Sequence, residues 1–217
     1  MNQVVVNPVG EVVLLAASGL AREVVSAAGT HHRIIGMLDD DEALHGTRVN
    51  GVEVLGPIGD APSQEADFLL CIGAGSGRRC VRDRLSQLGM KPACWATFID
   101  DTVRVPHGCT VGEGSIVFGG VVLTAGVRIG RHCVVMPNVT LTHDVHIHDY
   151  VTLAAGVSLG GGVVVEDEAY LGMNASIRQG VRIGAGATIG MGAVVLSDVP
   201  AGETWVGVPA NRMGARR

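Results

Sequence analysis

The second half of the chain repeats an apolar residue at every sixth position. All sixteen of these positions hold Val, Leu or Ile, and no insertion interrupts the count. They are Val105, Val111, Val117, Leu123, Ile129, Val135, Leu141, Ile147, Leu153, Leu159, Val165, Leu171, Ile177, Ile183, Ile189 and Val195. A six-residue period kept over so long a stretch predicts a parallel β-helix, in which successive short strands point apolar side chains into one core.

A second pattern marks the end of each repeat. The third residue after the apolar position is Gly, Asn, Asp or His in fourteen of the sixteen repeats, and the exceptions are Tyr150 and Glu168. Those four residue types tolerate a positive φ better than most others. We therefore expect every short strand to end at a corner.

The first half of the chain alternates apolar runs with stretches of helical spacing. The predicted strands are residues 12–17, 33–40 and 66–73, and the predicted helices lie within residues 18–29 and 77–89. Strands that alternate with helices predict a small parallel sheet of the Rossmann-like kind. We expect an α/β domain in residues 1–98 and a β-helix domain with a C-terminal cap in residues 99–217.

Composition and charge narrow the class of protein. Aromatic residues make up 3% of the chain and Gly occurs 32 times, which suits a regular β structure with many corners. A net charge of -5 offers no basic surface for nucleic acid or an anionic membrane. There is no apolar run of membrane-spanning length and no signal-peptide pattern at the N-terminus. Five cysteines without a CxxC pair indicate buried free thiols, and we expect a cytoplasmic protein.

The six-residue repeat resembles that of the hexapeptide-repeat acyltransferases. The resemblance implies a left-handed parallel β-helix with three repeats in each 18-residue coil. It also implies a homotrimer with active sites between neighbouring subunits.

The stretch "LTHDVHIHDY", residues 141–150, gathers three histidines in apolar surroundings. With 18 residues per coil, Gly161 stands one coil after His143. His143 could act as a general base, and the Gly161 N–H could stabilise an oxyanion. Asp144 could orient the imidazole, or it could simply occupy a corner. His146 and His148 fit ordinary exterior or interface positions.

The resemblance becomes closer when both halves are considered together. A small nucleotide-binding domain, the repeats, "THD" midway and the late "WVGVPANRM" are similar to one branch of these enzymes. That branch contains the NeuD-type sialic acid O-acetyltransferases and the N-acetyltransferases of nucleotide-linked 4-amino-4,6-dideoxy sugars, such as perosamine and bacillosamine. It implies that His143, Asp144 and Gly161 are catalytic, and that acetyl-CoA passes Gly161, Met173 and Met191. The tail itself is either this family ending or a packing cap.

The same resemblance points to substrate-binding residues in the first half. A glycine-rich turn of the family reads "AASGL" here, where the N–H groups of Ser18 and Gly19 could meet a phosphate and Leu20 replaces a frequent histidine. Asp39 and Asp40 match acids near the nucleotide in relatives, and Gly73 matches a nucleotide-proximal glycine. Each also fits a plain structural role, as a turn or a solvated strand end.

Two positions depart from relatives of this branch. Some of them carry a second histidine nine residues after the base, where this chain has Thr152. One carries an asparagine seven residues before the base, where this chain has Met136. Both departures concern the geometry around the sugar.

The function implied is acetyl transfer from acetyl-CoA to the C4 amine of a GDP-, UDP- or dTDP-linked amino sugar, in surface glycan biosynthesis and without a metal. Sialic acid O-acetylation is the alternative. A rival from another class is a zinc site, because the spacing of His107, His143 and His148 resembles that of gamma-class carbonic anhydrases. A non-catalytic scaffold is a further alternative.

Overall fold

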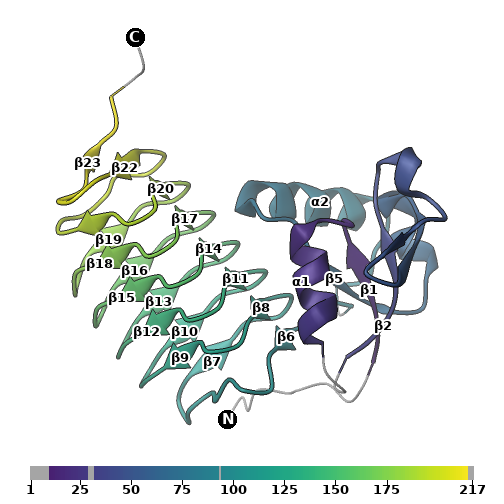
Figure 1. Cartoon of the computed structure of the whole chain (residues 1–217), viewed down its shortest axis with the longest axis horizontal. Coiled ribbons are helices and arrows are strands. Elements are labelled where there is room, and N and C mark those ends of the chain that lie inside the picture. Colours follow the sequence, from purple (N-terminus) through teal and green to yellow (C-terminus); the bar gives the residue numbers. More distant parts are fainter. Residues whose placement is uncertain (1–9, 29–31, 93, 215–217) are drawn as a thin grey trace.

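The computed structural model describes residues 10–28, 32–92 and 94–214. Figure 1 shows a long prism of stacked coils joined to a smaller unit of sheet and helices. The N-terminal segment considered for a signal peptide, and residue 29 at the end of the first predicted helix, lie almost wholly outside the described residues.

The smaller unit is an α/β structure built on a five-stranded sheet. Its elements are β1 (Glu11–Leu15), α1 (Gly19–Ala27), β2 (Arg33–Leu38), η1 (Glu42–Leu44), β3 (Arg48–Val49), β4 (Val52–Gly56), η2 (Ile58–Ser63), β5 (Asp67–Leu70) and α2 (Gly75–Gln87). The strand order is β3-β4-β2-β1-β5. All pairings are parallel except β3 with β4. The predicted parallel sheet is therefore confirmed, apart from this antiparallel hairpin at its edge.

The prism is made of short parallel strands. They are β6 (Phe98–Ile99), β7 (Thr110–Val111), β8 (Ile116–Val117), β9 (Val122–Leu123), β10 (Arg128–Ile129), β11 (Val134–Val135), β12 (Thr140–Leu141), β13 (His146–Ile147), β14 (Thr152–Leu153), β15 (Ser158–Leu159), β16 (Val164–Val165), β17 (Tyr170–Leu171), β18 (Ser176–Ile177), β19 (Arg182–Ile183), β20 (Thr188–Ile189) and β21 (Val194–Val195). From β6 to β18, each strand pairs with the strand 18 residues later, as Arg128 does with His146. The three sheets are those of a left-handed parallel β-helix, as the resemblance to the hexapeptide-repeat acyltransferases implies.

The three sheets form three faces of the prism. The first face contains β7, β10, β13, β16 and β19; the second contains β6, β8, β11, β14, β17 and β20; the third contains β9, β12, β15, β18 and β21. We name the edges by one residue each. The Asp149 edge joins the first face to the second, the Met191 edge joins the second to the third, and the His143 edge joins the third to the first of the next coil.

The repeat positions build the core and the corners. The apolar sixth residues are fully or almost fully buried from Val117 to Val195. The corner residues have a positive φ in fifteen successive repeats, from Gly108 to Gly192. Tyr150 and Glu168 share this conformation, with φ of 62° and 60°. The corner prediction therefore holds even at the two exceptional residues.

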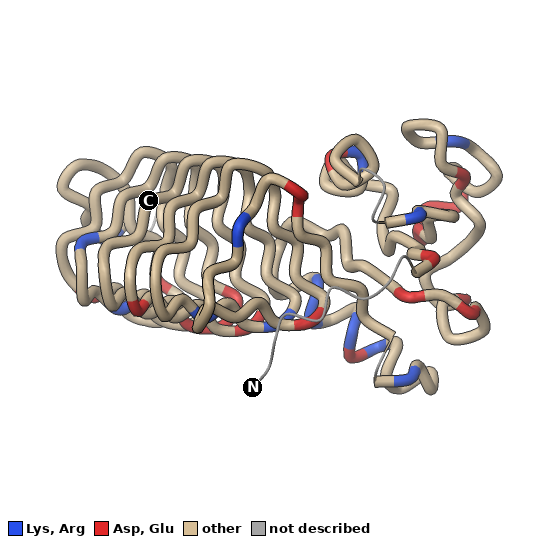
Figure 2. The backbone as a smooth tube through the Cα atoms, turned by 90° about the horizontal axis from the view of Figure 1, so that it is seen from below, with Lys and Arg blue, Asp and Glu red and all other residues tan. Residues whose placement is uncertain are grey.

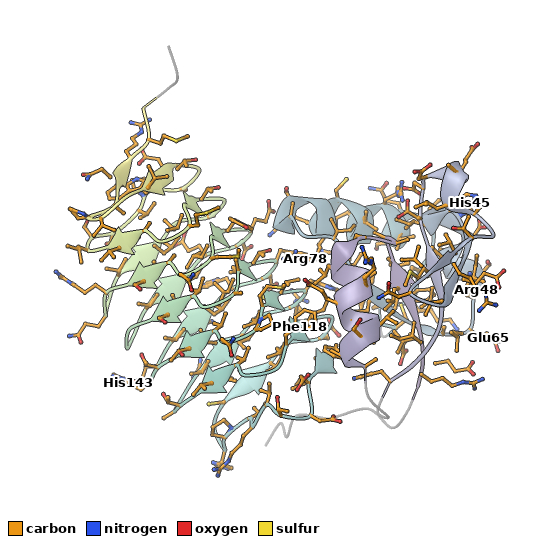
Figure 3. All side chains as sticks on the ribbon, in the orientation of Figure 1. His45, Arg48, Glu65, Arg78, Phe118 and His143 are labelled. Atoms are coloured by element: carbon orange, nitrogen blue, oxygen red, sulfur yellow. The ribbon has the colours of Figure 1, made fainter. Side chains whose placement is uncertain are left out.

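The second face is where the α/β unit docks. Ile116, Phe118 and Val134 point outward from this face, and all three are buried in one cluster with residues of β1, α1 and β5. Phe118 lies between the two units in Figure 3. Higher on the same face, Tyr170 is exposed. The described part of the α/β unit therefore covers the lower coils of this face and leaves the first and third faces open.

The C-terminal tail closes the top of the prism. β22 (Thr204–Val206) pairs in parallel with β20 and antiparallel with β23 (Asn211–Arg212). Trp205 packs against the core of the prism, and Ala210 belongs to it. The tail "WVGVPANRM" thus has the packing role that the sequence left open.

Two composition-based expectations can be compared with the structure. All five cysteines are free, but Cys80 is exposed and Cys94 is half-buried, so the expectation of buried thiols holds only for Cys71, Cys109 and Cys133. Burial raises the pKa of Cys133 to about 12 and that of Cys71 further, which keeps both thiols protonated. Among the described residues, no helix combines the length and apolarity that a membrane span needs.

Figure 2 shows few charged positions along much of the prism, with those present gathered mainly along one side. The Asp149 edge holds several of them. There Arg131 pairs with Asp149 at 3.0 Å, and the Asp149 N–H donates to Asp167 at 3.1 Å. Arg131 therefore pairs with an acid of the neighbouring coil, whereas Asp167 and Glu168 of the same edge pair with Arg79 of α2.

Ala16, in the turn after β1, has a φ of 80°, which an L side chain rarely adopts. We expect Ala16→Gly to raise the free energy of unfolding by about 0.5–1 kcal/mol, since relief of roughly 1–2 kcal/mol of strain exceeds the entropic cost of glycine. Urea unfolding at fixed protein concentration measures this change.

The matched control is Ala17→Gly, because Ala17 has no positive φ and holds its place through an N–H bond of 2.7 Å to Asp39. This variant should lose about 0.5–1 kcal/mol. Equal loss in both variants would show that Ala16 is not strained.

Candidate active site

The sequence-predicted base lies on an exposed edge of the prism. His143 and Asp144 occupy the turn between β12 and β13, and both side chains are largely exposed, at 69% and 74%. Figure 3 shows His143 on the side of the prism away from the α/β unit. Nothing in the described chain covers this pair, so a substrate can reach it from solvent.

Asp144 combines the two roles that the sequence left open. It occupies a corner with φ of 60°, and its N–H donates to the Ala125 carbonyl at 2.8 Å. Its carboxylate Oδ2 also lies 3.0 Å from Nδ1 of His143. A proton on Nδ1 that is donated to this carboxylate leaves Nε2 with a free lone pair. The geometry therefore suits a base that acts through Nε2.

Gly161 stands directly beside the imidazole, as the 18-residue coil predicts. A Cβ added at Gly161 would overlap Nε2 and Cε1 of His143, so the glycine allows the ring to lie in its present position. The neighbouring Gly162 N–H donates to the His143 carbonyl at 2.9 Å. Within the described part of the chain, the Gly161 N–H donates to no acceptor. A free N–H beside a base is the arrangement required to stabilise an oxyanion.

Met173 and Met191 lie on a different edge. They stand one coil apart on the Met191 edge, where the Gly192 N–H donates to the Met173 carbonyl at 2.8 Å. Both side chains are exposed, at 47% and 78%. Within one chain, the structure therefore does not bring these methionines into the column of His143 and Gly161.

The predicted substrate residues Ser18, Gly19 and Leu20 lie where α1 begins. Ser18 caps the helix, because its Oγ accepts from the Ala21 N–H at 3.3 Å and donates to the Cys71 carbonyl at 2.6 Å. Gly19 is exposed, and a Cβ added there would have no neighbouring atom within 4 Å. Leu20 is half-buried against the core of the α/β unit.

The other predicted residues lie at the carboxyl ends of β2 and β5. Asp39 accepts the N–H groups of Ala17 and Asp41, so it fixes the turn after β1. Gly73 is exposed with open space beside it. Asp40 accepts hydrogen bonds from the Ile58 N–H and from Arg84. It therefore contacts η2 and α2 and not the turn after β1.

These loops meet at a recognisable place in the sheet. Strands β2 and β5 lie on opposite sides of β1, so the strand order reverses beside β1. In parallel α/β sheets, ligands bind in the crevice outside the carboxyl ends of the strands at such a point. The turn at residues 16–19 and the loop at residues 72–74 follow the carboxyl ends of β1 and β5 at that point, and we call the space between them the candidate crevice.

The base and this crevice are not brought together within one chain. The α/β unit covers the second face, and the His143 edge is opposite that face. Figure 3 shows the labelled His143 and Arg78 on different sides of the prism. Sequence reasoning did not reveal this separation.

The two positions that depart from relatives lie beneath the α/β unit. Thr152 is 5% exposed and donates to the Gly73 carbonyl at 2.9 Å. Met136 is half-buried against the cluster that joins the two units. Sequence reasoning also missed Arg78, which is fully buried between the units although it is charged.

The three histidines of the zinc alternative do not gather in one chain. His107 stands on the His143 edge two coils below His143, and His148 belongs to the first face, where it stacks on His146 at 4.5 Å. The described residues contain no group of three or more His, Cys, Asp or Glu side chains placed to hold a metal ion.

Asp144→Asn isolates the charge of Asp144, since asparagine also tolerates the positive φ of the corner. We expect kcat to fall about tenfold, because a neutral amide stabilises the protonated imidazole less well than a carboxylate does. Steady-state kinetics test this expectation. Wild-type turnover would show that Asp144 serves the corner alone.

Comparison with known proteins gives consistent matches. Residues 126–161 and 162–197 match the family model described as bacterial transferase hexapeptide (six repeats). No match was found among curated protein sequences.

Three solved structures resemble almost the whole chain. A mutant of perosamine N-acetyltransferase from Caulobacter crescentus, in complex with CoA and GDP-perosamine, is 28% identical with a TM-score of 0.83 over 95% of this chain and 98% of that chain. The acetyltransferase domain of PglB from Neisseria gonorrhoeae, in complex with acetyl coenzyme A, is 28% identical with a TM-score of 0.82 over 94% and 98%. WeeI from Acinetobacter baumannii is 31% identical with a TM-score of 0.76 over 93% and 99%.

Proposed function

This chain belongs to the bacterial hexapeptide-repeat acetyltransferases, and from that premise we propose that it transfers the acetyl group of acetyl-CoA to the C4 amine of a nucleotide-linked 4-amino-4,6-dideoxy sugar. The observation that carries the proposal is the exposed His143–Asp144 pair beside the free N–H of Gly161. Those groups supply a base and an oxyanion donor for acyl transfer.

In the proposed reaction, the amine attacks the thioester carbonyl carbon directly. Nε2 of His143 takes the proton that the amine loses, and the Gly161 N–H donates to the oxygen that becomes negative. Asp144 stabilises the resulting imidazolium through Nδ1. The C–S bond then breaks, and the imidazolium returns its proton to the leaving thiolate.

The nucleotide part of the acceptor is assigned to the crevice at the carboxyl ends of β1 and β5. Support comes from the N–H groups at the start of α1 and from the open space beside Gly19 and Gly73, which allow phosphate oxygens to approach the backbone. The similar perosamine enzyme binds GDP-perosamine. A GDP-, UDP- or dTDP-linked amino sugar is therefore the proposed acceptor, ahead of sialic acid.

A homotrimer is part of the proposal, because one chain holds the base and the crevice on opposite sides of its prism. The first and third faces flank the His143 edge and are not covered by the α/β unit. Contact between copies through these faces would allow the crevice of one chain to serve His143 of another. In that arrangement, Met173 and Met191 of one chain would line the acetyl-CoA that is bound beside His143 and Gly161 of a neighbouring chain.

The test is a thiol-release assay with acetyl-CoA against GDP-, UDP- and dTDP-linked 4-amino sugars and free sialic acid, with metal content measured on the same preparation. Turnover with one amino sugar supports the proposal and names its nucleotide. Turnover with sialic acid alone would favour O-acetylation. Absence of turnover together with stoichiometric zinc would revive the three-histidine alternative.

A further inference from the structure

Arg78, on α2, is 0% exposed, and within the described part of the chain it pairs with no carboxylate. It donates six hydrogen bonds to uncharged oxygens, of which five are backbone carbonyls and the sixth is Thr152 Oγ1. Burial lowers its pKa to about 10, so the guanidinium stays charged at neutral pH. A buried charge is costly unless its hydrogen bonds are satisfied, so this arrangement calls for a specific role.

One side of the guanidinium holds the loop after β5. Nη1 donates to the Ile72 carbonyl at 2.7 Å and to the Gly73 carbonyl at 2.8 Å. The loop then reaches Gly75, where an added Cβ would overlap the Tyr150 carbonyl oxygen. The glycine-rich loop that flanks the crevice is thus pressed against the prism and fixed there by Arg78.

The other side holds the prism. Nε donates to the His132 carbonyl at 2.7 Å, and Nη2 donates to the Tyr150 carbonyl at 2.8 Å and to Thr152 Oγ1 at 3.0 Å. The Thr152 hydroxyl in turn donates to the Gly73 carbonyl at 2.9 Å. Thr152 therefore contacts both the loop and the guanidinium, and it closes the link between the two units.

The coil that accepts the bonds from Nη2 also carries the proposed catalytic pair. Tyr150 and Thr152 lie in the same coil as His143, seven and nine residues after it. That coil is clamped further by Tyr150, whose ring stacks on His132 at 5.1 Å and whose hydroxyl accepts from Arg82 at 2.7 Å. The candidate nucleotide-binding loop is therefore joined to the coil of His143 directly, through Thr152, and also through Arg78.

We propose that Arg78 and Thr152 are positioning residues that set the orientation of the nucleotide-binding loop relative to the coil of His143. This inference rests on the proposed function. If the sugar is bound by one chain and acetylated at the His143 edge of another, each chain must hold its loop in a fixed orientation to its own prism. The guanidinium of Arg78 has five N–H donors and can bond the loop after β5 and the prism at the same time, which a lysine ammonium cannot.

The test compares Thr152→Val with Thr188→Val. Both threonines lie at the same position of the second face, two coils apart, but Thr188 forms no side-chain hydrogen bond with the described residues of the α/β unit. We expect Thr152→Val to raise the KM for the nucleotide-linked sugar about fivefold, the effect of one lost hydrogen bond. The KM for acetyl-CoA and the KM values of Thr188→Val should remain at wild-type levels. Arg78→Lys should raise the KM for the sugar more than Thr152→Val does.

Two further measurements separate the possible failures. Thermal unfolding shows whether each variant is folded, and calorimetry measures the binding of GDP, UDP and dTDP without turnover. A Thr152→Val protein with a lowered Tm but a wild-type KM and nucleotide affinity would overturn the inference and leave the proposed function intact. A wild-type protein that neither acetylates the sugars nor binds a nucleoside diphosphate would overturn both.

Discussion

His143→Ala is expected to lower kcat by about 10²–10⁴-fold, the contribution of a general base. The side chain is exposed and its Nε2 makes no hydrogen bond within the described chain, so the fold does not depend on it. Binding of acetyl-CoA should change little, since the proposed role of the ring is to accept a proton. Single-turnover kinetics and calorimetry with CoA measure the two quantities separately.

His107→Ala is the matched control for this variant. His107 is also exposed and stands on the same edge two coils below. Under the proposed function it should turn over like the wild type. A loss in His107→Ala as large as that in His143→Ala would favour the zinc alternative, in which both imidazoles are ligands. Loss of CoA binding with normal turnover in His143→Ala would contradict the role of base.

Gly161→Ala is expected to lower kcat by about 10²-fold or more, the effect of moving a catalytic group by roughly 1 Å. Gly161 has no positive φ, so alanine fits the backbone, but the new Cβ overlaps the imidazole of His143. The backbone N–H is retained. The variant therefore displaces the base without removing the oxyanion donor.

A double-mutant cycle shows whether this loss acts through His143. In the His143→Ala background there is no ring to displace, so adding Gly161→Ala should lower kcat by less than about twofold. Additive losses in the double variant would mean that Gly161 contributes independently of the ring, for example through the path of the thioester.

The fold of the prism could be predicted because each six-residue repeat has the same pattern, a buried apolar residue followed three positions later by a corner. The two exceptional corners are instructive. Tyr150 accepts from Arg82 and lies under the Arg79 guanidinium, at 4.8 Å, and Glu168 pairs with Arg79. These contacts with α2 explain why a tyrosine and a glutamate occupy positions of positive φ that small residues usually take.

Two features were not predicted, namely the β3–β4 hairpin and the burial of Arg78 between the units. The β3–β4 hairpin had a local signal, since Asn50 and Gly51 form its turn with φ of 47° and 82°. Arg78 had none, because an arginine in a polar helix is usually exposed.

Prediction of the candidate site was similarly divided. The pairing of His143 with Gly161 follows from coil spacing alone. The separation of His143 from the crevice follows from which face the α/β unit covers, and the outward apolar residues Ile116, Phe118 and Val134 were the available signal.

The six-residue unit also limits how such a chain can change in length during evolution. Between the docked coils and His143, insertion of one hexad would turn the base by a third of a revolution onto another edge, while insertion of a whole coil would keep its edge but raise it by about 4.8 Å. Above Met191, the last residue proposed to line acetyl-CoA, whole coils can be gained or lost without altering either relationship. The top of the prism is therefore free to vary in height, and the part below it has a fixed number of coils.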